Sequence, residues 1–101
     1  MTPEGKVKKR VKQILNTFEA VYFEMPVPTG YGKSGLDFSC CVNGKALFIE
    51  TKAPGEEPTP RQRETMIKQL DAGATVFIIS DERGHQALID WLLQHTRPKG
   101  V

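Results

Sequence analysis

Residues 36–52, LDFSCCVNGKALFIETK, predict a β-hairpin. Its centre, Asn43-Gly44, is the dipeptide most typical of a two-residue type I′ turn, because both central positions of that turn need a positive φ. The expected strands are Leu36 to Val42 and Lys45 to Lys52. Apolar residues dominate both strands, so at least one face of the hairpin should pack against a core.

An acidic pair stands at the open end of this hairpin. The turn fixes the register, which places Asp37 directly opposite Glu50. Cross-strand neighbours have Cβ atoms roughly 4.5–5.5 Å apart, and like charges there destabilise a sheet. Lys52 projects on the same face as Glu50, because side chains alternate along a strand. Two hard oxygen donors suit Mg²⁺, whereas the plainer alternative is a solvated hairpin end with a surface ion pair.

The acidic pair belongs to a recognisable pattern. Gly35-Leu36-Asp37, followed after twelve residues by Glu50-Thr51-Lys52, resembles the PD-(D/E)xK nuclease signature, with Leu36 in place of the proline. Glu4 on an expected first helix and Pro60-Arg61-Gln62 at the start of a later helix extend the likeness. Within the superfamily the chain is most similar to the virus-type replication-repair nuclease domain (VRR-NUC), with Holliday junction resolvases related in pattern.

The resemblance implies an α/β fold with a restriction-endonuclease-like core, a mixed sheet of about four strands flanked by helices. It implies a metal-dependent DNA endonuclease acting on branched DNA, with Mg²⁺ as the cofactor and Mn²⁺ able to substitute. The implied metal ligands are Asp37, Glu50, the Thr51 carbonyl and Glu4, and the implied catalytic residues are Asp37, Glu50, Lys52, Glu4 and Gln62. Two alternatives stay open: a flap-directed, end-directed or restriction-type nuclease, and a non-catalytic DNA-binding module.

Length and charge set the limits for binding. The chain has 101 residues and a net charge of +2, which predicts a single nuclease domain over residues 1–101 without a separate DNA-binding module. Positive charge is concentrated near the N-terminus, in Lys6, Lys8, Lys9, Arg10 and Lys12. Such a cluster indicates phosphate contact or a solvated helix face. Neither a membrane span nor a signal peptide is evident, so a cytoplasmic protein is expected, in a bacterium or a phage-infected host.

The first third of the chain predicts a helix, a strand and a loop. Thr2 can cap a helix that has Pro3 at its first position, and apolar residues recur on one face of that helix. Glu4 falls on this face, either as support for the helix dipole or as a site residue. A strand is expected from Ala20 to Met25. In the loop from Pro26 to Gly35, Tyr31 and Lys33 are expected to contact DNA.

The second half predicts a helix, a strand and a helix. Thr59 opens a helix that runs to about Asp71, and Arg61 is a further candidate for DNA contact. Gln62 has two interpretations, a capping box with Thr59 or a place beside the active site, and one side chain is expected to serve only one of them at a time. The apolar run Ala74 to Ser80 predicts a parallel strand covered on both faces. A last helix is expected from about Gly84 to His95.

The sequence also leads to expectations about the cysteines, the histidines and the oligomeric state. Cys40 and Cys41 are read as reduced core residues, and His85 and His95 as surface or helix-end residues. A homodimer is expected because a four-way junction must be cut on two strands, and closed two-fold dimers are the commonest oligomers. Candidate apolar residues for its interface are Trp91, Leu93 and Ile67.

Overall fold

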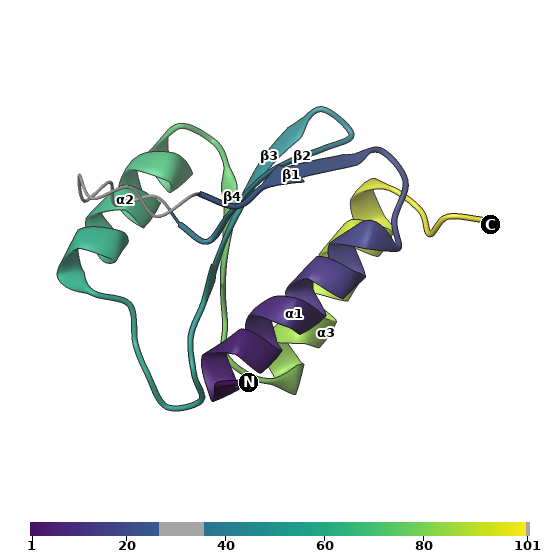
Figure 1. Cartoon of the computed structure of the whole chain (residues 1–101). Helices are drawn as coiled ribbons and strands as arrows, with labels where there is room; N and C mark the ends of the chain where they lie inside the picture. The colour runs from purple at the N-terminus through teal and green to yellow at the C-terminus, as the bar shows by residue number, and fades with distance from the viewer. Residues whose placement is uncertain (27–35, 101) are drawn as a thin grey trace.

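A computed structural model describes residues 1–26 and 36–100 of the chain. Tyr31, Lys33 and Gly35 therefore lie outside the described residues. The elements follow the order helix, three strands, helix, strand, helix (Figure 1). Their bounds are α1 Pro3–Asn16, β1 Val21–Glu24, β2 Phe38–Val42, β3 Lys45–Thr51, α2 Pro60–Asp71, β4 Thr75–Ile79 and α3 Glu82–His95.

The four strands form one mixed sheet in the order β1-β2-β3-β4. β1 and β2, and β2 and β3, pair antiparallel, whereas β3 and β4 pair parallel around the α2 crossover. The expected hairpin is confirmed: Val42 pairs with Lys45, Phe38 pairs with Ile49, and the two turn residues have φ of 49° and 84°. The α/β fold class predicted from the sequence is therefore correct.

The helices lie on both sides of this sheet, with α1 and α3 side by side against one face and α2 against the other (Figure 1). The core lies between the α1–α3 pair and the sheet. Alternate strand residues enter it because side chains of a strand point in turn to opposite faces. Its fully buried members include Val11, Ile14, Phe38, Val42, Leu47, Ile49, Ile79, Leu88 and Leu92.

Local sequence explains where the helices begin. The side chains of Thr2, Thr59 and Asp81 accept hydrogen bonds from backbone N–H groups in the first turns of α1, α2 and α3. Such caps satisfy donors that have no partner within the helix. The Asp81 cap starts α3 two residues before the expected Gly84. After α2, Gly73 has φ of 94°, a left-handed conformation that ends the helix.

Burial differs from the expectations at three places. His85 lies in the first turn of α3, a helix end as expected, but it is buried against α1, where its Nε2 lies 3.3 Å from the Val7 carbonyl oxygen. Cys40 is buried, which raises its thiol pKa to about 12, but Cys41 points to the opposite face and is exposed. β4 is less covered than its apolar run predicts, since Ile78 is 46% exposed. Ile79 enters the core, so Ile78 points to the opposite face, where α2 leaves it partly open to solvent.

The segment after α3 returns to the turn between α1 and β1. The Glu19 N–H donates to the Arg97 carbonyl, the Lys99 N–H donates to the Thr17 carbonyl, and the Arg97 side chain forms an ion pair with the Glu19 carboxylate. These contacts fasten the end of the described chain to the start of the sheet. Within residues 1–26 and 36–100, no helix has the length and apolar character needed to cross a bilayer.

Candidate active site

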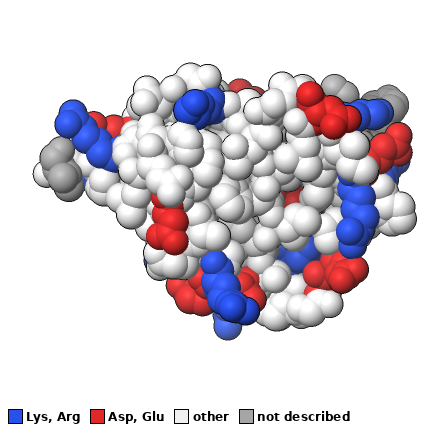
Figure 2. All heavy atoms as spheres, turned by 180° about the vertical axis from the view of Figure 1, so that it is seen from behind, with Lys and Arg blue, Asp and Glu red and all other residues white. Residues whose placement is uncertain are grey.

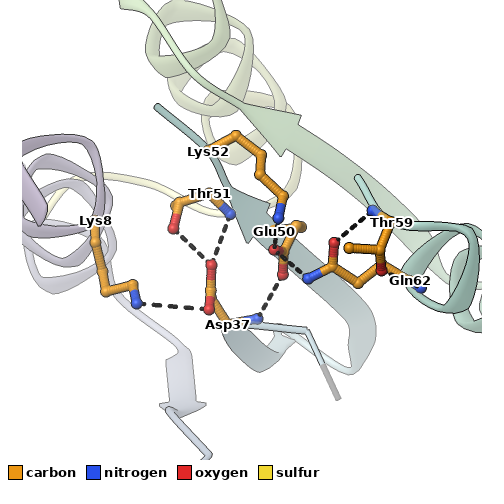
Figure 3. A network of polar contacts seen from close by, with 7 residues as sticks. All are labelled: Lys8, Asp37, Glu50, Thr51, Lys52, Thr59 and Gln62. Atoms are coloured by element: carbon orange, nitrogen blue, oxygen red, sulfur yellow. Dashed lines mark hydrogen bonds and ion pairs between the residues drawn. The ribbon is translucent and has the colours of Figure 1, made fainter. Parts of the chain in front are cut away.

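Asp37 and Glu50 meet at the open end of the hairpin, as the register predicted (Figure 3). Asp37 precedes β2, and its backbone N–H donates to Glu50 Oε1 at 3.2 Å. Its Oδ2 atom accepts from both the N–H and the hydroxyl of Thr51, at 2.9 and 2.6 Å. Glu50 is only 2% exposed. Two carboxylates are therefore held side by side at the end of the sheet.

Two lysines compensate the acidic pair from opposite sides. Lys52, itself largely buried, places Nζ 3.3 Å from Glu50 Oε2. Lys8 reaches in from α1, with Nζ 3.5 Å from Asp37 Oδ1 (Figure 3). The positive charge that a pair of cross-strand acids requires is thus supplied both by the residue that follows β3 and by α1.

Gln62 binds the site and caps α2 at the same time, so the expectation that it could serve only one role is wrong. Its Oε1 accepts from the Thr59 N–H at 2.9 Å, while the Gln62 N–H donates to Thr59 Oγ1 at 3.1 Å. Its Nε2 donates to Glu50 Oε2 at 2.7 Å. Both roles coexist because an amide carries an acceptor at one end and donors at the other.

The electrostatics of the site follow from this crowding. The pKa of Glu50 is raised, first by burial and second by the nearby Asp37 carboxylate, while Lys52 and the Asp37 N–H act in the opposite direction. Burial disfavours a charged carboxylate and a like charge adds to that cost, whereas a cation offsets both. The site therefore gains from any further positive charge placed between the two acids.

The donor set fits a divalent metal ion. Glu50 and Asp37 present hard carboxylate oxygens, and Mg²⁺ commonly binds to only one or two protein carboxylates. Oδ1 of Asp37 accepts no hydrogen bond from the described residues and meets only Lys8. Glu4 does not form a three-carboxylate cluster with the two acids. Residues 1–26 and 36–100 contain no group of three His, Cys, Asp or Glu side chains placed to hold a metal.

The remaining candidates are dispersed. The cations of α1 other than Lys8 are exposed, as is Arg61 at the start of α2. Glu4 is half-buried one helical turn before Lys8, on the same side of α1. Lys8 is thus the residue whose place the sequence reasoning missed. The spacing of four residues from Glu4, already expected to face the site, was the signal that could have found it.

Thr51 binds Asp37 through groups other than the carbonyl that the resemblance implies as a metal ligand. Its buried hydroxyl and N–H both bind Asp37, so the residue between Glu50 and Lys52 orients the other acid. The sequence pattern treats this position as variable. Only the register of the hairpin, which brings residue 51 beside residue 37, reveals the contact.

Comparisons with known proteins agree with this architecture. A solved structure described as a VRR_NUC domain superposes with a TM-score of 0.76 at 22% sequence identity, covering 89% of this chain and 97% of that chain. The chain therefore has the fold of a VRR_NUC domain, and the resemblance found in the sequence is confirmed for the fold.

One curated relative is also similar in sequence. It is named "Putative nuclease p44", from Acyrthosiphon pisum secondary endosymbiont phage 1, and is 40% identical over 40 residues. The aligned segment spans 40% of this chain and 43% of that protein, less than half of either. No family model matches the chain.

Proposed function

We propose that this chain is a metal-dependent DNA nuclease that hydrolyses phosphodiester bonds in branched DNA. The observation that carries the proposal is the convergence of Asp37, Glu50 and Lys52 at one end of a hairpin, with the acids buried or half-buried and Glu50 bound by Gln62. The VRR_NUC fold and the nuclease name of the similar phage protein support the same reaction class.

The residues of the site would divide the work. Asp37, Glu50 and the Thr51 carbonyl would hold Mg²⁺ or Mn²⁺, with Glu4 as a more distant contributor. When bound, the ion would polarise the scissile phosphate and lower the pKa of a coordinated water. Lys52 would orient the attacking water and stabilise the negative charge that develops on the phosphate. Gln62 would keep the Glu50 carboxylate in place through its 2.7 Å hydrogen bond.

The DNA would be held mainly through its phosphates. Lys6, Lys8, Lys9 and Arg10 on α1 and Arg61 on α2 are proposed to bind the backbone, together with Tyr31 and Lys33 in the loop outside the described residues. Phosphate contacts position a duplex without reading its sequence, so the shape of the DNA would decide selectivity. A second copy of the chain would supply the site for the other strand of a junction. The protein would act in the cytoplasm of a bacterium or of a phage-infected host.

Cleavage assays test this proposal. The protein is incubated with a four-way junction, a flap and a linear duplex, each with and without Mg²⁺, beside the variants Asp37→Asn, Glu50→Gln and Lys52→Met. We expect Mg²⁺-dependent cleavage of the junction and a loss of at least about a hundredfold in each variant, since each removes a group that acts in the transition state.

Asparagine is preferred to alanine as the replacement for Asp37. The amide introduced by Asp37→Asn would keep an oxygen for the buried Thr51 N–H, whereas alanine would leave that donor unsatisfied at a cost of about 1–3 kcal/mol. Preferred cleavage of the flap or the duplex end would reassign the substrate. DNA binding without cleavage under any metal would favour a non-catalytic module.

A further inference from the structure

The four carboxylate oxygens of the acidic pair are not equally satisfied. Asp37 Oδ2 accepts two hydrogen bonds from Thr51, Glu50 Oε1 accepts one from the Asp37 N–H, and Glu50 Oε2 accepts one from Gln62. Within the described residues, Asp37 Oδ1 has only the Lys8 ammonium group at 3.5 Å. This oxygen is therefore the least satisfied of the four.

Lys8 differs from the other cations of α1. Its side chain is 35% exposed and reaches an acid of the site, whereas Lys6, Lys9 and Arg10 are exposed on the helix surface. A strong charge-assisted hydrogen bond between ammonium and carboxylate spans roughly 2.7–2.9 Å, so the 3.5 Å separation is a loose contact. A long, flexible lysine held this loosely at the edge of a site can leave it at little cost.

We propose that Lys8 has two positions: it neutralises Asp37 while the site holds no metal, and it withdraws to the DNA phosphate once a divalent cation takes Oδ1. This inference rests on the proposed function. A cation bound at Asp37 would weaken the hold on Lys8, because it neutralises the carboxylate and repels the ammonium group. The ammonium group is thereby released close to the acids, where a scissile phosphate would lie.

Lys8 then competes with the metal ion for the Asp37 carboxylate, whereas a lysine that only binds phosphate does not. Its test uses Lys8→Met, which keeps the apolar stem and removes the charge. The matched control is Lys45→Met, which removes the same charge from an exposed residue at the turn end of the hairpin. Titration calorimetry with Mn²⁺ alone, without DNA, should show roughly fivefold tighter binding for Lys8→Met than for the control. Equal or weaker binding would overturn the competition.

Thermal melting of the metal-free proteins tests the first position separately. Lys8→Met should melt about 2–4 °C below Lys45→Met, since Asp37 and Glu50 then repel each other with only Lys52 to compensate. If the unaltered protein binds no Mn²⁺, the metal site of the proposed function fails. The melting comparison still decides whether Lys8 neutralises Asp37, and equal melting temperatures would reject it.

DNA binding tests the second position. With Ca²⁺, which supports binding without the catalytic geometry expected of Mg²⁺, Lys8→Met should bind a four-way junction about three- to fivefold more weakly than the unaltered protein. Without a divalent ion, the double variant Lys8→Met/Asp37→Asn should bind the junction as the unaltered protein does, because it removes both partners of the ion pair and leaves the local net charge unchanged. An equal loss in both conditions would make Lys8 an ordinary phosphate contact and overturn the proposal.

Discussion

At the level of single residues, Gln62 links the capping box of α2 to the acidic site. The Thr59 N–H is a donor and needs an oxygen as its partner, so the capping box turns the Oε1 end of the Gln62 amide toward the helix start. The Nε2 end is then left facing Glu50. A flipped amide would place its oxygen against the carboxylate, which is repulsive. The cap thus selects the amide orientation that the acidic site needs.

Two substitutions separate the cap from the site. Thr59→Ala removes the hydroxyl that accepts from the Gln62 N–H, which should cost about 1 kcal/mol and lower the melting temperature by roughly 4–8 °C with little effect on cleavage at 25 °C. Gln62→Glu keeps an oxygen for the Thr59 N–H but loses the donor to Glu50 and adds a like charge. Its cleavage rate should fall about 10- to 100-fold.

Melting curves and single-turnover cleavage of the same preparations give the comparison. If both variants lose stability and activity in parallel, Gln62 acts only through the helix. A Gln62→Glu variant with unchanged turnover would remove Gln62 from the site altogether.

At the level of secondary-structure elements, α1 has a buried apolar face and an exposed cationic face. Its apolar residues, Val7, Val11, Ile14 and Leu15, are buried against the sheet and α3, and Lys8 lies at the edge of that buried face. The other cations are exposed to solvent. A single helix therefore both supplies an ion-pair partner to the acidic site and presents positive charge to solvent.

The exposed cations of α1 should determine the salt dependence of DNA binding. Replacing Lys6 and Lys9 by alanine should make the slope of log K against log salt shallower by about 1–2 units, because fewer counterions are released when phosphate contacts are lost. The loss of affinity should be similar for junction, flap and duplex. Lys45→Ala with Lys99→Ala is the charge-matched control. The same slope change in that control would mean that the α1 cations form a solvated helix face without specific phosphate contacts.

At the scale of the whole molecule, apolar side chains remain uncovered. Ile67 of α2 is 59% exposed and Leu93 of α3 is 52% exposed. Trp91 is less available for an interface than expected. Its ring stacks on that of His95, with ring centroids 4.1 Å apart, and makes an edge contact with Phe77. Figure 2 shows that the centre of the rear face carries few charged side chains, while most Lys, Arg, Asp and Glu lie toward its margin. Exposed apolar side chains that gather in a patch are typical of interfaces.

We therefore expect a homodimer at micromolar concentration. Sedimentation equilibrium should give about twice the chain mass of 11.3 kDa, and Ile67→Glu or Leu93→Glu should shift the protein toward monomer, depending on which helix lies in the interface. Monomer in both the free protein and its complex with a four-way junction in Ca²⁺ would contradict the dimer. It would favour a flap- or end-directed nuclease, which needs only one site.

The hairpin, its register and hence the meeting of Asp37 and Glu50 could be predicted from the amino-acid sequence. These features are local: Asn43 and Gly44 accept the left-handed turn, and the alternation of side chains does the rest. Helix starts at Thr2 and Thr59 were equally readable, because a cap depends on residues three positions apart.

Which other side chains complete the site depends on how distant segments pack together, and this could not be predicted from the sequence. Lys8 lies 29 positions from Asp37 along the chain, and the angle at which α1 packs on the sheet brings the two together. The burial of His85 and the exposure of Ile78 depend in the same way on how closely each helix covers its sheet face. Contacts between distant segments follow from packing geometry, which no periodicity within a single segment records.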